Sequence, residues 1–100
     1  MDKERRKMTE LRETLSKLLS EVARERIVQN SMWGGAVNDY YHSRKDWCNF
    51  IEAYTKWAWM QIQMQHPNKY RERMVQVAAL AVAAIESHDR KMENTPKDPI

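Results

Sequence analysis

The segment MVQVAALAVAAI, residues 74–85, decides the fold of this chain. It contains no charged residue, and Gln76 is its only polar side chain. A helix over these residues is apolar nearly all round, so it belongs in the middle of a bundle, with other helices against it. Its five alanines let neighbouring backbones approach closely. We therefore expect a core helix from about residue 68 to residue 91.

A second helix is predicted from about residue 43 to residue 65. Ser43 and Asp46 have the spacing of a capping box, in which each side chain accepts a hydrogen bond from the other residue's backbone amide. Pro67 lacks a backbone donor and predicts the end of this segment. One face of the helix carries apolar side chains at helical spacing: Trp47, Phe50, Ile51, Tyr54, Trp57 and Ala58.

A third helix precedes these two, from about residue 3 to residue 30. Its apolar residues recur three and four positions apart, at Met8, Leu11, Leu15, Leu18 and Val22. This stripe suits packing against an antiparallel neighbour or a second subunit. We expect an all-α three-helix unit, two long helices around the alanine-rich core helix, that assembles into an oligomeric helical bundle. Residues 1–92 form its single domain, and residues 93–100 form a loose tail.

Composition limits the setting in which the chain works. It has 100 residues, of which 42% are apolar, so a lone unit is marginal and self-association is expected. A single Cys48 and a charged N-terminus favour a cytoplasmic protein without a disulfide. The longest apolar run is too short to span a membrane. The net charge of +3 is spread along the chain, which argues against binding extended nucleic acid.

The residues most suited to holding a ligand gather between the first two helices. All four tryptophans fall between Trp33 and Trp59, and Trp33 opens the only glycine pair. Glycines expose backbone amides, aromatic rings stack on a base, and basic side chains neutralise phosphate. The candidate ligand-binding residues are Trp33, Gly34, Gly35, Asp39, Tyr40, His42, Arg44, Trp47 and Lys56.

These residues also have a plain structural interpretation. The glycine pair can simply end the first helix, and Asp39 and His42 can tether the loop before the second. Trp47 and Trp57 share a helical face and are assigned to the core, whereas Trp33 and the off-face Trp59 are expected to seek a partner surface.

Catalytic and metal-binding patterns are sparse. Glu86 and Asp89 have the spacing of two ligands on one helix face, but the second helix adds only Glu52, with Lys56 one turn later. We expect no metal or cofactor, and Mg²⁺ only if the chain is a hydrolase. The three histidines and Cys48 have no zinc-site spacing, and Cys48 is more typical of a small packing residue than of a nucleophile.

A family resemblance extends over residues 24–91. It is carried by Glu25-Arg26, Gln29, Trp33-Gly34-Gly35, Asp39, His42-Ser43, Asp46-Trp47, Ile51, Tyr70-Arg71, the segment 74–86 and Asp89-Arg90. The order of these residues resembles small helical phage and prophage proteins that are similar to MazG-type nucleoside triphosphate pyrophosphatases. The resemblance implies a bundle that associates through its long helices and binds nucleotides through Mg²⁺ held by paired acidic residues.

The predicted function follows from the ligand candidates and the resemblance together. Where the superfamily has its first acidic pair, this chain has residues such as Ala53, Tyr54 and Lys56, so we favour a protein that is not an enzyme. We expect a phage-type protein that binds a nucleotide-like or anionic ligand, sequestering a host signalling nucleotide or countering host defence. The alternatives are a divergent Mg²⁺-dependent nucleotide pyrophosphohydrolase and an inhibitor module that binds a host protein.

Overall fold

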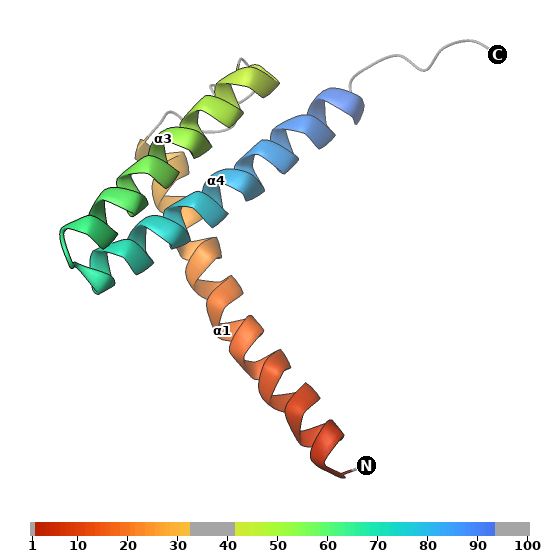
Figure 1. Cartoon of the computed structure of the whole chain (residues 1–100). Helices are drawn as coiled ribbons and strands as arrows, with labels where there is room; N and C mark the ends of the chain where they lie inside the picture. The colour runs from red at the N-terminus through yellow and green to blue at the C-terminus, as the bar shows by residue number, and fades with distance from the viewer. Residues whose placement is uncertain (1, 33–41, 94–100) are drawn as a thin grey trace.

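The computed structural model describes residues 2–32 and 42–93, and these residues form three helices and no strand. Helix α1 spans Asp2–Met32, α3 spans Arg44–Gln63 and α4 spans Pro67–Glu93 (Figure 1). The predicted all-α class and the order of the helices are confirmed. Among the described residues, no helix is long and apolar enough to cross a membrane.

The start of α3 is fixed by the predicted capping box. The Ser43 hydroxyl accepts a hydrogen bond from the Asp46 amide at 3.0 Å, and the Asp46 carboxylate accepts one from the Ser43 amide at 2.8 Å. These contacts satisfy two groups that the first turn of a helix leaves without an intrahelical partner. The Ser43 backbone hydrogen bond is the main reason that the pKa of Asp46 is lowered.

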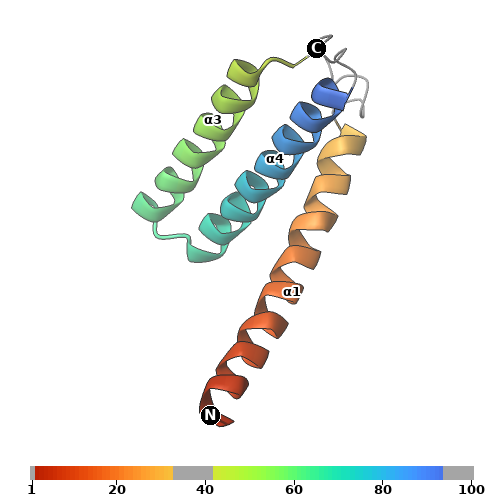
Figure 2. The same cartoon turned by 90° about the vertical axis from the view of Figure 1, so that its right-hand side faces the viewer.

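A tight turn joins α3 to α4 and makes them an antiparallel hairpin (Figure 2). Helix α3 ends at Gln63, two residues before the predicted end, and Gln65 has a positive φ of 58°. Pro67 then begins α4, one residue before the predicted start. Proline is favoured at the first helical position because its fixed φ suits the helix and its missing N–H would have no partner there.

The core lies between α3 and α4, near the start of α3. Trp47, Leu80 and Ala83 are buried together, and the partly buried Phe50, Ile51, Tyr54 and Ala84 pack against them. The prediction that Trp47 and the middle of α4 form the core is therefore correct. Ala58 and Ala79 are also buried, which fits a hairpin whose small residues let the helices approach.

Helix α1 packs on α4 through its C-terminal third. Gln29 is buried and donates a hydrogen bond from Nε2 to the Gln76 carbonyl at 3.2 Å. Two ion pairs join the same helices: Arg26 to Glu86 at 3.0 Å, and Arg71 to Glu21 at 2.8 Å. Since α4 packs on both α1 and α3, the alanine-rich helix is central, as predicted.

One expectation about the core is wrong. Trp57, which was assigned to the core, is 43% exposed, and α4 places Arg73 over its indole ring, 5.3 Å from the ring centre.

The middle of α4 is enclosed on two sides only, by α1 and by α3. Ile85 is 61% exposed and Val82 36% exposed, since neither α1 nor α3 covers the face of α4 on which they lie.

Candidate functional site

The most unusual surface of the molecule is the N-terminal part of α1. Every residue from Asp2 to Ser20 is exposed, and this part of the helix extends away from the hairpin (Figure 1). The exposed residues include the large apolar side chains Met8, Leu11, Leu15, Leu18 and Leu19, which we call the α1 stripe. Leu19 is the most exposed of the five, with 63% of its surface accessible. Exposed apolar patches of this kind mark interaction sites.

The α1 stripe continues the face that already packs inside the chain. In a helix of 3.6 residues per turn, Leu11, Leu15 and Leu18 lie on the same side as Val22 and Gln29. Gln29 is buried against α4 and Val22 is partly buried, whereas the three leucines one to three turns earlier are exposed. This helix face is therefore packed at its C-terminal end, whereas at its N-terminal end no other described helix covers it.

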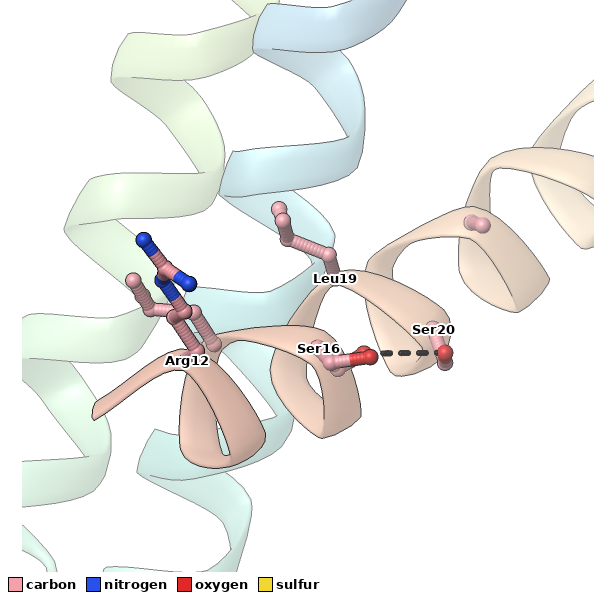
Figure 3. Close-up of a pocket in the computed structure, with 6 residues that line it drawn as sticks. Arg12, Ser16, Leu19 and Ser20 are labelled. Carbon is pink, nitrogen blue, oxygen red and sulfur yellow. Dashed lines mark hydrogen bonds between the residues drawn. The ribbon is translucent and has the colours of Figure 1, made fainter. Parts of the chain in front are cut away.

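A shallow depression of about 490 Å³ runs along this part of α1. It is lined by Arg12, Leu15, Ser16, Leu19, Ser20 and Ala23. Figure 3 shows the Leu19 and Arg12 side chains standing out from the helix, and the Ser20 hydroxyl bonded to the Ser16 carbonyl at 2.9 Å. That hydroxyl is satisfied by its own helix. The depression thus offers a mainly apolar surface, which suits another helix better than a polar ligand.

The predicted ligand-binding residues are only partly brought together. Trp33, Gly34, Gly35, Asp39 and Tyr40 lie outside the described residues. The partly buried His42 ring stands edge-on to Trp47, with 5.3 Å between ring centres, and the Lys91 ammonium donates to the His42 carbonyl. Trp47 is only 5% exposed, so it contributes to the core and offers little surface to a ligand.

The two basic candidates on α3 lie apart. Arg44 is exposed at the start of the helix, and Lys56 pairs with Glu52 at 3.2 Å. Twelve residues of helix separate Arg44 from Lys56, a rise of about 18 Å. A single small ligand at the start of α3 would not reach both basic side chains.

Two of the three acidic residues of the hydrolase alternative, Glu52 and Glu86, are paired with basic side chains, and the third, Asp89, is exposed. Glu86 accepts from Arg26 at 3.0 Å and lies 3.9 Å from Arg90, and Glu52 pairs with Lys56. Positive charge beside a carboxylate opposes the binding of a cation there. Within residues 2–32 and 42–93, no three His, Cys, Asp or Glu side chains come together as a metal site.

Sequence reasoning identified the α1 stripe as a packing face but did not propose it as the site. The signal was present: the centre of α4, residues 74–85, is apolar nearly all round, so two helices of one chain are too few to cover it. Comparisons with models of known families, with curated proteins and with solved structures found no match. The likeness to MazG-type phage proteins and the nucleotide ligand that it implies therefore remain predictions.

Proposed function

We propose that this chain acts through protein association, as a homodimer in which the α1 stripe of each copy packs on the other. The observation that carries the proposal is that every residue from 2 to 20 is exposed, in a helix whose apolar residues recur mainly three and four positions apart. Most of the stability of a helix in a protein comes from packing its apolar face against a partner. A second copy supplies that face and is present wherever the chain is made.

The exposed area of the chain supports a dimer. A compact folded protein of 12.0 kDa exposes about 6,000 Å². The chain exposes 8415 Å², an excess of about 2,400 Å² per copy over that value. Uncovered apolar faces such as the α1 stripe add to this excess, and a second copy would reduce it by burying them.

The free energy gained by burying the α1 stripe also favours a dimer. Fully burying one large aliphatic side chain stabilises a protein by about 1.5–3 kcal/mol. The five side chains are roughly half exposed, so covering them contributes on the order of 5 kcal/mol per copy. Covering both α1 stripes contributes on the order of 10 kcal/mol per dimer, against an association cost of at least about 4 kcal/mol. Replacing two leucines of each copy with glutamate removes part of this gain and also buries unpaired charges, so it should dissociate the dimer.

The test replaces Leu11 and Leu15 with glutamate and measures molar mass by sedimentation equilibrium. The unchanged chain is expected as a dimer, and Leu11→Glu/Leu15→Glu as a monomer of 12.0 kDa. The matched control is Thr9→Glu, an exposed position about a third of a turn off the α1 stripe, which should remain dimeric. Circular dichroism checks that α3 and α4 stay helical. A monomeric unchanged chain would contradict the proposal.

A further inference from the structure

The outer face of α4 is another apolar surface that the described helices leave uncovered. It lies opposite the core and contains Met74, Ala78, Ala81, Val82 and Ile85, which we call the α4 face. Met74 is 40% exposed and Ile85 61% exposed, while the two alanines are partly buried. No charged residue occurs between positions 74 and 85. A surface this apolar is more typical of a helix interface than of a solvated face.

The α4 face matches the α1 stripe in length. The stripe runs from Met8 to Leu19 and the face from Met74 to Ile85, and each covers eleven helical steps, or about 17 Å. The two surfaces can therefore lie along each other without leaving either end in water.

They also match in side-chain size. The α1 stripe presents one methionine and four leucines, whereas the centre of the α4 face presents two alanines and a valine. Large side chains on one helix pack best into the spaces that small ones leave on the other. A pairing of two α1 stripes would instead set leucine against leucine and would leave both α4 faces exposed.

From these matches we infer that the α1 stripe of one copy docks on the α4 face of the other copy, and the reverse. This inference rests on the proposed dimer and adds the surface that receives α1. In a two-fold dimer a contact between two different surfaces occurs twice, so all four apolar surfaces are covered. Each α4 is then surrounded by its own α3, its own α1 and the α1 of the partner.

The docking is tested by cross-linking single cysteines in mixed dimers. In a Cys48→Ser background, one preparation carries Leu15→Cys and a second, labelled with ¹⁵N, carries Ala78→Cys. The two are mixed, allowed to exchange subunits and treated with a short bismaleimide, and mass spectrometry identifies which copies are joined. We expect joined pairs of one labelled and one unlabelled copy, several-fold above a control mixture in which Glu52→Cys on exposed α3 replaces Ala78→Cys.

The outcomes separate this inference from the dimer itself. Sedimentation of the Cys48→Ser background shows first whether it is a dimer, and a monomer there would overturn the proposed function and the docking together. If the background is dimeric but position 78 is joined no more often than position 52, the docking on α4 is wrong and the dimer stands. Efficient joining of two Leu15→Cys copies to each other would show instead that the α1 stripes meet.

Discussion

At the scale of residues, the cap of α3 and the ion pairs of α1 depend on ionised carboxylates. The pKa of Asp46 is lowered mainly by the Ser43 backbone hydrogen bond, and the pKa of Glu21 mainly by the Arg71 side chain. A carboxyl whose folded pKa lies below its unfolded value stabilises the fold above the unfolded pKa. That stabilisation is lost as the pH falls through the folded pKa.

We therefore expect the melting temperature to fall as the pH drops from about 5 to below about 4, the usual range of these carboxyls. Asp46→Asn should flatten the fall, because the asparagine side chain does not take up the proton. The measurement is the melting temperature by circular dichroism at a series of pH values. An Asp46→Asn curve as steep as that of the unchanged chain would show that the cap does not couple to pH.

The cap of α3 and the exposure of Trp57 show what the sequence could predict at this scale. The Ser43 and Asp46 cap was predictable because it depends on residues three apart in the chain. The exposure of Trp57 was not, because it depends on Arg73, which α4 brings over the ring from sixteen positions away. Interactions between residues that are near each other in the sequence can be predicted from it, whereas interactions between distant residues depend on how the helices pack.

At the scale of elements, the turn between α3 and α4 holds one residue in an unfavourable conformation. Gln65 has φ 58°, a left-handed conformation that costs a residue with a Cβ roughly 1–2 kcal/mol. Glycine avoids this cost but loses more conformational entropy on folding. Gln65→Gly should therefore stabilise the hairpin by up to about 1 kcal/mol.

Urea unfolding of the two proteins measures this difference. The matched control is Met64→Gly, one position earlier, where φ is −84° and glycine brings only its entropic cost. The control should lower stability. A loss of stability in both variants would mean that the backbone at Gln65 is not under strain.

The elements themselves were largely predictable from sequence. The 3.6-residue periodicity and the cap signal placed all three helices to within about two residues of their observed bounds. The ends between residues 63 and 67 were less certain, because Pro67 can follow one helix or begin the next. The sequence also showed that the centre of α4, residues 74–85, is apolar nearly all round, but not which of its faces the other helices cover.

At the scale of the whole molecule, the proposed dimer makes stability depend on protein concentration. A partner that binds only the folded state stabilises it by about 2.7 kcal/mol at a hundred times its dissociation constant. We expect the melting temperature to rise over about a hundredfold increase in concentration of the unchanged chain. Leu11→Glu/Leu15→Glu should melt at the same temperature throughout.

Differential scanning calorimetry at each concentration measures both proteins. A melting temperature that does not change with concentration for the unchanged chain would show that assembly and folding are not coupled.

The candidate site as a whole was only partly predictable from sequence. The apolar spacing of Leu11, Leu15 and Leu18 was readable, but their exposure follows from the direction in which α1 leaves α4.

Because α1 packs on α4 through its C-terminal third, a small change of angle at that contact moves the N-terminal end of α1 by a large distance. From Glu21 to Asp2 the helix is about 28 Å long, so a tilt of about 10° at the contact moves its far end by about 5 Å, nearly one helical turn. The Glu21–Arg71 and Arg26–Glu86 ion pairs lie at this contact between α1 and α4. Surface ion pairs contribute little to stability. We expect these two pairs to fix the angle at which α1 leaves α4, and so the register at which the α1 stripe meets the partner copy.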